Sequence, residues 1–338
     1  MPWQLVSHAA QLRVVAMAEP LPAGDVAMAA TGASDSDSDD GISGFAVLKA
    51  AGLSIDGVGT LEPVAVLAGH SDRVWHVSWC KTKNMLATCG GDKSVRLWAP
   101  KPTPTAPATD GAAGAGAAGA GAGAGSPEAQ QAWVCVETLD GVAMRTVRLC
   151  EWSPCGRYLA TASFDGAVRV WEIRAGGESE LLATLEGHEN EVKCVAWSAD
   201  GQFLASCGRD KSIWVWDATE VEEGGEYECV SVLHGHTQDV KFVAFHPQRS
   251  QLISTSYDDT IKSWEEADDD WINTDTLTGH GSTVWQASFE GNGERLATCS
   301  ADLVVKVWKQ FEGAAKDGSS RYKCVATLPK LHSRTIFR

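Results

Sequence analysis

The chain has 338 residues, and 44% of them are hydrophobic, which is ordinary for a globular protein. Its net charge of −16 argues against direct binding to a nucleic-acid backbone, because such binding needs clustered lysine and arginine side chains. No apolar stretch approaches the roughly 18–20 residues that a membrane-spanning helix requires.

Residues 1–60 are expected to form a weakly ordered leader. The first part of this segment carries one arginine and no acidic residue before Glu19, and it lacks the apolar core and cleavage pattern of a secretory signal. An organelle transit peptide and an unstructured extension both fit this composition. The first strand signal follows at residues 64–67 and runs directly into Gly69-His70.

From residue 61 onward one unit is copied along the chain. Five times an aspartate is followed six residues later by a tryptophan, and a serine or threonine stands four residues before each aspartate. In four copies a histidine lies 22 residues before the aspartate, whereas Ala143 stands at this place in the second copy. The repeated residues, copy by copy, are His70, Thr88, Asp92 and Trp98; Thr161, Asp165 and Trp171; His188, Ser206, Asp210 and Trp216; His236, Ser254, Asp258 and Trp264; and His280, Thr298, Asp302 and Trp308.

This repeat predicts the fold. A unit of about 40–45 residues that opens on Gly-His and closes near Trp-Asp is the signature of a β-propeller blade of four strands. In the third copy, alternation of apolar and polar residues predicts strands at 192–197, 203–206, 213–216 and 229–233. We therefore expect an all-β WD-repeat β-propeller over residues 61–338, with five complete blades.

Two segments depart from the repeat. Residues 101–131, between the third and fourth strands of the first copy, include a Gly/Ala run that is expected to be a flexible insertion. After an outer strand at 324–328, a sixth copy begins at residues 332–336 and the chain ends at Arg338. Because a propeller usually closes with a terminal strand, we expect a truncated form of a longer protein, the alternative being a ring of fewer blades.

The repeated histidine, hydroxyl and aspartate are also the residue types of a hydrolase triad. Active sites do not recur in every repeat, whereas a buried hydrogen-bond network does, with the aspartate accepting from the histidine and the hydroxyl linking histidine to tryptophan. We interpret the set as structural and expect an incomplete network in the second copy. The sequence holds no phosphate loop, His-Glu-x-x-His or Gly-x-Ser-x-Gly, so we predict no catalytic residue and no enzyme.

Ten cysteines raise the question of a metal or iron–sulfur site. Six of them recur with the repeat, as small buried strand residues do. These are Cys89, Cys207 and Cys299 before the repeat aspartates, and Cys135, Cys229 and Cys324 in the fourth strands. No Cys-x-x-Cys pair occurs, and we expect neither a metal site nor a cofactor. Free thiols without a secretory signal indicate a reducing cytosol.

Partner-binding residues are expected on one rim, at the positions one and three residues after the repeat histidine and just before the repeat aspartate. Arginine and aromatic residues are the usual anchors of interfaces. The residues selected are Arg73, Phe164, Glu189, Glu191, Arg209, Asp239 and Tyr257. Phe164 and Tyr257 are expected to be exposed, and Arg209 to lie beside carboxylates of neighbouring blades. Alternatively, Arg209 is a salt-bridged rim charge with no role in partner binding.

Seven segments carry a more specific likeness. They are GHSDRVWHVSW (69–79), RTVRLCEWSPCGRYLATASFD (145–165), LEGHENEVKCVAWS (185–198), RDKSIWVWD (209–217), EYECVSVLHGHTQDVK (226–241), SYDDTIKSW (256–264) and HSRTI (332–336). Over residues 65–338 the sequence resembles the WD-repeat subunits of the cytosolic iron–sulfur protein assembly (CIA) targeting complex.

The resemblance implies a seven-bladed ring, of which this chain would lack the rest of blade six and all of blade seven. It also implies a non-catalytic scaffold that docks a HEAT-repeat scaffold, a small carrier subunit and apo iron–sulfur proteins. The implied location is the cytoplasm, with the nucleus as an additional one. The surface arginine of the family's RDKS turn corresponds to Arg209.

One other function fits part of the sequence, and another does not. Residues 171–174 read Trp-Glu-Ile-Arg, close to the Trp-Asp-x-Arg ending with which substrate receptors of cullin-type ubiquitin ligases grip their adaptor. A hydrolytic or lyase propeller with a metal in its channel would need a ring of histidines or carboxylates outside the structural positions, and the sequence shows none. We therefore expect protein partners, with no direct nucleic-acid or membrane contact.

Overall fold

The computed structural model describes residues 65–101, 132–141, 143–174, 176, 178–219, 226–267, 270–311, 320–328 and 335, together with the backbone of three short strands nearer the N-terminus. Every regular element in these ranges is a β-strand, which confirms the all-β prediction. Within the same ranges, no helix is long and apolar enough to cross a membrane.

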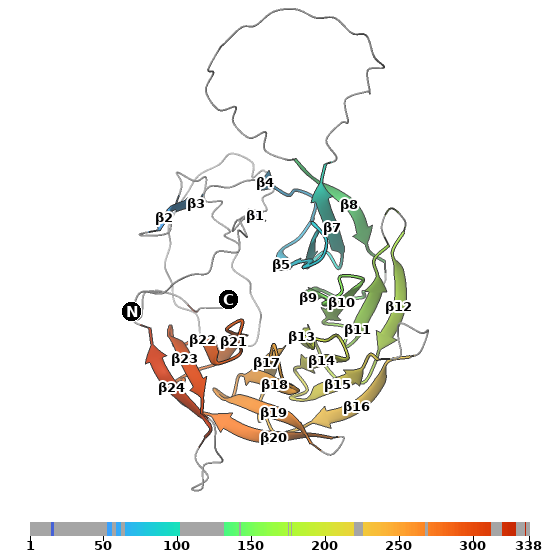
Figure 1. The fold of residues 1–338 in the computed structure, drawn as a ribbon. Coiled ribbons are helices and arrows are strands. Elements are labelled where there is room, and N and C mark those ends of the chain that lie inside the picture. Colours follow the sequence, from blue (N-terminus) through green and yellow to red (C-terminus); the bar gives the residue numbers. More distant parts are fainter. Residues whose placement is uncertain are drawn as a thin grey trace, which may run out of the picture. The chain divides into compact units, whose positions relative to one another are not determined.

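Five four-stranded sheets, here called blades one to five, follow one another in chain order (Figure 1). Blade one holds β5 (Val74–Trp79), β6 (Leu86–Gly90), β7 (Val95–Pro100) and β8 (Trp133–Leu139). Blade two holds β9 (Val147–Trp152), β10 (Tyr158–Ser163), β11 (Val168–Glu172) and β12 (Glu180–Leu185). Blade three holds β13 (Val192–Trp197), β14 (Phe203–Gly208), β15 (Ile213–Asp217) and β16 (Glu228–Leu233). Blade four holds β17 (Val240–Phe245), β18 (Gln251–Ser256), β19 (Ile261–Ala267) and β20 (Asp270–Leu277), and blade five holds β21 (Val284–Phe289), β22 (Arg295–Ser300), β23 (Val305–Gln310) and β24 (Tyr322–Thr327).

In each blade, consecutive strands are neighbours in the sheet, which is the arrangement expected of a propeller repeat. The four strands predicted for the third copy are found as β13 to β16, with boundaries that differ by at most two residues. The first strands of successive blades contact one another, β5 with β9, β9 with β13, β13 with β17 and β17 with β21. The five-bladed propeller array is therefore confirmed.

The turn after each repeat aspartate has a fixed backbone geometry. The aspartate carboxylate accepts a hydrogen bond from the backbone N–H two residues later, as Asp210 does from Ser212 at 3.1 Å. This turn places the residue between them in the left-handed region, which favours glycine. Glycine occupies the position only in blade two, as Gly166. The other blades accept non-glycine residues there, namely Lys93, Lys211, Asp259 and Leu303, with φ between 66° and 70°.

Aromatic side chains fill the seams between blades. In the seam of blades two and three, Trp197 lies 6.5 Å from Tyr158 and 6.5 Å from Tyr227, centroid to centroid. The corresponding positions of blades three and four carry Phe203, Phe245 and Trp271, whose rings meet edge to face at 5.8 Å. Edge-to-face contacts of this kind add stabilisation beyond the burial of apolar area.

The cysteine prediction is wrong for half of the repeated set. Cys89, Cys207 and Cys299 are buried, as expected. Exposed cysteines are found in the fourth strands, namely Cys135, Cys229 and Cys324. The fourth strand is the outermost of each blade and has a sheet neighbour on one side only. Side chains of β24 after Tyr322 accordingly face solvent.

Several expectations fall largely outside the described residues. The predicted strand at 64–67 is found as β4 (Ala65–Val66), which pairs in parallel with β1 (Val15–Ala16). Within the predicted leader, β2 (Leu53–Ile55) pairs with β3 (Gly59–Leu61). The insertion lies between β7 and β8, but residues 102–131 themselves, the weak order of the leader and the start of a sixth copy are not described. The chain divides into two compact units, residues 1–69 with 100–135, and residues 70–99 with 136–338.

Candidate partner-binding rim

A buried chain of hydrogen bonds runs through blade three. The Trp216 indole N–H donates to Ser206 Oγ at 3.1 Å, and Ser206 Oγ lies 2.9 Å from His188 Nε2. On its other side, His188 Nδ1 lies 2.7 Å from an oxygen of Asp210. An indole can only donate and a carboxylate can only accept, so the hydroxyl donates to Nε2 and the Nδ1–H donates to the aspartate.

The same arrangement recurs in blades one, four and five. Histidine–aspartate distances are 2.8 to 2.9 Å, and histidine–hydroxyl distances are 2.7 to 2.8 Å. The residues are His70, Thr88, Asp92 and Trp98; His236, Ser254, Asp258 and Trp264; and His280, Thr298, Asp302 and Trp308. The same hydrogen bonds recur in four blades, and each of these side chains is bonded to partners in its own blade. We therefore interpret these side chains as structural.

Burial and hydrogen bonding act in opposite directions on the aspartates. Burial would raise the pKa of Asp210, but the hydrogen bond from His188, the electrostatic attraction of its imidazole and the bonds from Ser212 together lower the pKa to about 2. Burial also lowers the pKa of His70 and of His280, although their aspartate partners act against it. These carboxylates are therefore ionised at neutral pH.

In blade two, which lacks the histidine, an arginine pairs with the repeat aspartate. Ala143 contributes no imidazole, and Asp165 instead pairs with the buried Arg169, whose Nη2 lies 3.0 Å from Oδ2. Thr161 Oγ1 donates to the Arg169 carbonyl, and the buried Trp171 Nε1 has no hydrogen-bond partner. Sequence reasoning missed Arg169. Arg96 also stands four residues after its repeat aspartate, Asp92, in a blade that has its histidine. The position of Arg169 in the sequence therefore did not show that it replaces the histidine.

The predicted rim positions are brought together by a backbone hydrogen bond that repeats in every blade. The N–H of the residue before the repeat aspartate donates to the carbonyl three residues after the histidine position. In blade three Arg209 N–H donates to the Glu191 carbonyl at 2.9 Å, and in blade four Tyr257 N–H donates to Asp239 at 3.0 Å. Arg73 is the acceptor in blade one and Phe164 the donor in blade two. The Glu189 side chain, two residues before Glu191, is exposed.

The surroundings of Arg209 differ from the prediction. Its side chain is 49% exposed, and its Nη1 lies 3.7 Å from Glu191, a carboxylate of its own blade. The neighbouring blade supplies another cation instead, Arg145, whose Nη1 donates to Glu191 Oε1 at 3.0 Å. The expectation of carboxylates from neighbouring blades is therefore wrong. Glu191 lies where the two blades meet and draws a guanidinium from each.

Phe164 and Tyr257 are half-buried, not exposed as predicted, because cations cover their rings. Lys193 Nζ lies 4.7 Å from the Phe164 ring centroid, and Lys241 Nζ lies 3.5 Å from that of Tyr257. Such cation–π contacts are individually worth about 0.5–2 kcal/mol. Both lysines stand five residues after the histidine position, an offset that sequence reasoning overlooked. The same offset holds Trp75, Arg148 and Trp285 in the other blades.

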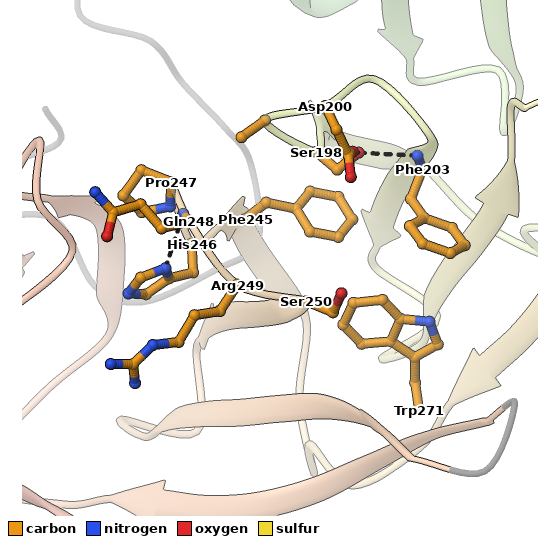
Figure 2. A pocket seen from close by; sticks show the side chains of 11 residues that line it. Ser198, Asp200, Phe203, Phe245, His246, Pro247, Gln248, Arg249, Ser250 and Trp271 are labelled. Carbon is orange, nitrogen blue, oxygen red and sulfur yellow. Dashed lines mark hydrogen bonds between the residues drawn. The ribbon is translucent and has the colours of Figure 1, made fainter. Parts of the chain in front are cut away.

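A pocket of about 350 Å³ lies at the other ends of the strands, between the β13–β14 and β17–β18 turns. Figure 2 shows Phe203, Phe245 and Trp271 grouped on one side of it, with Asp200 close to the two phenylalanines and Arg249 farther from the aromatic rings. None of the predicted site residues lines it. Among the residues that the structure describes, no group of three or more His, Cys, Asp and Glu side chains is placed to hold a metal ion.

His246 lines this pocket, and its protonation at low pH is expected to destabilise the β17–β18 turn that carries it. Its Nε2 lies 3.2 Å from the Gly293 carbonyl, and its Nδ1 accepts the Gln248 N–H at 3.0 Å, so the ring is neutral. Burial lowers its pKa below 6.5. Stability from the neutral ring is thus lost as the pH falls below 6.5, since the unfolded chain then binds the proton more readily.

We expect the melting temperature of the His246→Asn variant to fall less than that of the unaltered chain between about pH 7.5 and pH 5.5. Asparagine keeps an acceptor for the Gln248 N–H but does not titrate. Burial raises the pKa of Glu151 to about 8, which contributes in the opposite direction, so the difference between the two proteins is the quantity to measure. Equal falls would show that His246 does not carry the effect.

Comparison with known proteins gives the family. The WD domain, G-beta repeat, matches residues 61–99, 133–172, 179–217, 227–265 and 271–309. A "Probable cytosolic iron-sulfur protein assembly protein Ciao1" of Culex quinquefasciatus is 47% identical over 287 residues, covering 83% of this chain and 76% of the relative. The chain belongs to this family of WD-repeat cytosolic iron–sulfur protein assembly proteins. A homologue of Schistosoma japonicum with a corresponding name is 41% identical, covering 81% of this chain and 70% of the relative. A "Probable cytosolic Fe-S cluster assembly factor" of Schizosaccharomyces japonicus is 43% identical over 75% of this chain and 37% of the relative.

The WD repeats of this family member are staggered against its blades. The match over residues 133–172 begins with β8, the outer strand of blade one, and ends with β11, the third strand of blade two. The four matched repeats after the first thus each contribute strands to two blades.

Proposed function

We propose that this chain is a non-catalytic propeller scaffold of the cytosolic iron–sulfur protein assembly machinery. The observation that carries the proposal is the 47% identity, across most of both chains, to a relative named as an assembly protein of this kind. The recurring histidine, hydroxyl and aspartate side chains support a non-catalytic role, because their hydrogen bonds are used within each blade.

The proposed partners are a HEAT-repeat scaffold, a small carrier subunit and apo iron–sulfur proteins, which receive their cluster while held by the assembled complex. The proposed location is the cytoplasm, with nuclear clients as well. The names of the relatives support the first of these locations. Iron–sulfur clusters are cargo in this scheme, so the chain need not bind one itself.

We place partner binding on the rim that carries Arg209, with Arg73, Phe164, Glu189, Glu191, Asp239 and Tyr257 as further contacts. Arg209 is half exposed, and its ion pair with Glu191 at 3.7 Å is too long for a hydrogen bond. A guanidinium held in this way keeps donors available to a partner. Loss of an arginine anchor at an interface commonly costs about 2 kcal/mol or more of binding free energy.

Arg209→Glu is expected to reduce capture of partner proteins at least tenfold while leaving the melting temperature nearly unchanged. The measurement is affinity purification of the tagged chain from its own cells, with quantitative mass spectrometry of co-purifying proteins. Arg174→Glu is the matched control, because Arg174 is also half exposed and also pairs with a glutamate, Glu172, in the Trp-Glu-Ile-Arg segment.

The outcomes separate the candidates. Loss of iron–sulfur assembly partners with Arg209→Glu alone supports the proposed site, and unfolding of that variant would make its role structural. Cullin and its adaptor as dominant partners, lost with Arg174→Glu, would replace the proposal with the ubiquitin-ligase function. Arg174 is already bound by Glu172 and Glu180 within blade two, and Ile173 beside it is buried, which does not favour that outcome.

A further inference from the structure

One part of the rim concentrates positive charge in an otherwise acidic protein. The Glu191 cluster consists of Arg145, Phe164, Glu191, Lys193 and Arg209, from blades two and three. Arg145 Nη1 binds Glu191 at 3.0 Å and donates to the Phe164 carbonyl at 2.8 Å. Two cations lie near the Phe164 ring, with Arg145 Cζ 5.9 Å and Lys193 Nζ 4.7 Å from its centroid.

The cluster carries three cations around one carboxylate. Burial alone would raise the pKa of Glu191. Its backbone hydrogen bond and the Arg145 guanidinium lower the pKa by more than burial raises it, so the carboxylate is ionised. The five residues of the cluster therefore carry a charge of about +2 in a chain whose net charge is −16. The Arg145 and Arg209 side chains are 56% and 49% exposed, whereas Glu191 is 12% exposed. The cations thus face the solvent while the acid lies beneath them.

A second pair of arginines that share one glutamate provides a comparison. Arg157 and Arg174 also share one glutamate, Glu172, and both are 51% exposed. There, however, Glu180 binds Arg174 as a second carboxylate, and the group is electrically balanced. In the Glu191 cluster the two arginines share the single carboxylate of Glu191 among the residues that the structure describes. Within the described ranges, no second carboxylate pairs with Arg145 or Arg209 as Glu180 does with Arg174.

We propose that the Glu191 cluster binds a carboxylate side chain of an acidic segment in a protein partner, between the guanidinium groups of Arg145 and Arg209. This inference rests on the proposed function, since it names the kind of segment that the rim receives. Arginine forks bind carboxylates in fixed geometry, and Lys193 over Phe164 adds a third positive group.

A nucleic acid fits the cluster less well. Phosphate backbones are bound by many cations spread along a groove, and three cations in one place release few counterions. The large negative charge of the whole chain also repels a long polyanion, whereas a short acidic peptide touches only the local positive area.

The test is a titration of the full chain into a peptide of alternating glutamate and glycine that carries a neutral fluorescent dye, followed by anisotropy. We expect binding that weakens as salt rises, and no binding of the glutamine–glycine counterpart. The double variant Arg145→Ala/Arg209→Ala is expected to weaken binding about fivefold or more. The matched control Arg157→Ala/Arg174→Ala makes the same charge change at the Glu172 cluster and should leave binding within about twofold.

A variant that is expected to bind the peptide more tightly distinguishes a change in the site from general damage to the fold. Glu191→Gln removes the competing carboxylate but keeps an oxygen for Arg145, so we expect tighter binding of the acidic peptide, by about twofold or more. Equal weakening by the two arginine double variants, or tighter binding of an oligothymidylate of equal charge, would overturn the proposal.

The result also remains distinct from that of the proposed function. If the acidic peptide does not bind while Arg209→Glu still loses its cellular partners, the rim is a partner site but its ligand is not acidic. If the peptide binds as expected while Arg209→Glu captures partners normally, the Glu191 cluster is an acidic-peptide site and the placement of partner binding at Arg209 is wrong.

Discussion

Replacing Trp216 with alanine is expected to lower the free energy of unfolding by about 3–5 kcal/mol, as large truncations in a packed core do. The side chain is 5% exposed and stacks on Trp214 with ring centroids 5.4 Å apart. It also donates its indole N–H to Ser206, so the variant loses both packing and one end of the blade-three hydrogen-bond chain. Urea unfolding followed by circular dichroism measures the change.

The indole hydrogen bond can be separated from packing by substituting phenylalanine at two equivalent positions. Trp216→Phe removes a hydrogen-bonded N–H, whereas Trp171→Phe removes an N–H of blade two that has no partner. We expect Trp216→Phe to cost about 1 kcal/mol more, the usual worth of one such bond. An equal or larger loss at Trp171 would show that the repeated chain of hydrogen bonds does not stabilise the blades.

Asp210→Ala is expected to be about as destabilising, by roughly 3–5 kcal/mol, because it leaves buried donors without their acceptor. The carboxylate accepts from His188 Nδ1, from the Ser212 hydroxyl and from two backbone N–H groups. The matched control is Asp200→Ala, an exposed turn aspartate that also accepts a hydroxyl and a backbone N–H. Loss of that aspartate should cost about 1 kcal/mol or less.

Asp210 also makes the free energy of unfolding depend on pH in the acidic range. Because the pKa of Asp210 falls from 3.8 to about 2 on folding, its contribution is complete above pH 3.8 and is lost as the pH falls towards 2. The difference in the free energy of unfolding between the unaltered chain and Asp210→Ala should therefore become smaller over that pH interval. A gap that stays constant, or equal costs for Asp210→Ala and Asp200→Ala, would contradict the role assigned to this carboxylate.

Much of the fold could be predicted because its information is local and repeated. The strands of blade three follow from period-two alternation and turn residues within one copy, and β13 to β16 lie where the alternation places them. The chain His188–Ser206–Asp210–Trp216 follows from spacing alone, since four copies repeat one set of offsets. Repetition excludes chance, and a blade that must satisfy its own buried polar groups leaves few alternatives.

What could not be predicted depends on how one blade meets the next. Spacing identified Glu191 and Arg209 as rim residues, but the cation that Glu191 binds most closely is Arg145, from a different copy of the repeat. Likewise, the covering of Phe164 in blade two depends on Lys193, which belongs to blade three. Such contacts are set by the angle and separation of packed sheets, which no single repeat encodes.

The sequence by itself determined the architecture, the repeated hydrogen-bond network and the family to which the chain is similar, because these reside in residue identity and spacing. Only the tertiary structure decided that Arg169 replaces the missing histidine of blade two, and that two blades converge on Glu191 with three cations. Both are consequences of side chains filling space left by others. For Glu191 the physical reason is that charge pairing acts through distance, and Arg145, 46 residues away in the chain, comes within reach only when the sheets assemble. Arg169 is only four residues from Asp165, and there the folded blade decides that its side chain is buried beside the carboxylate.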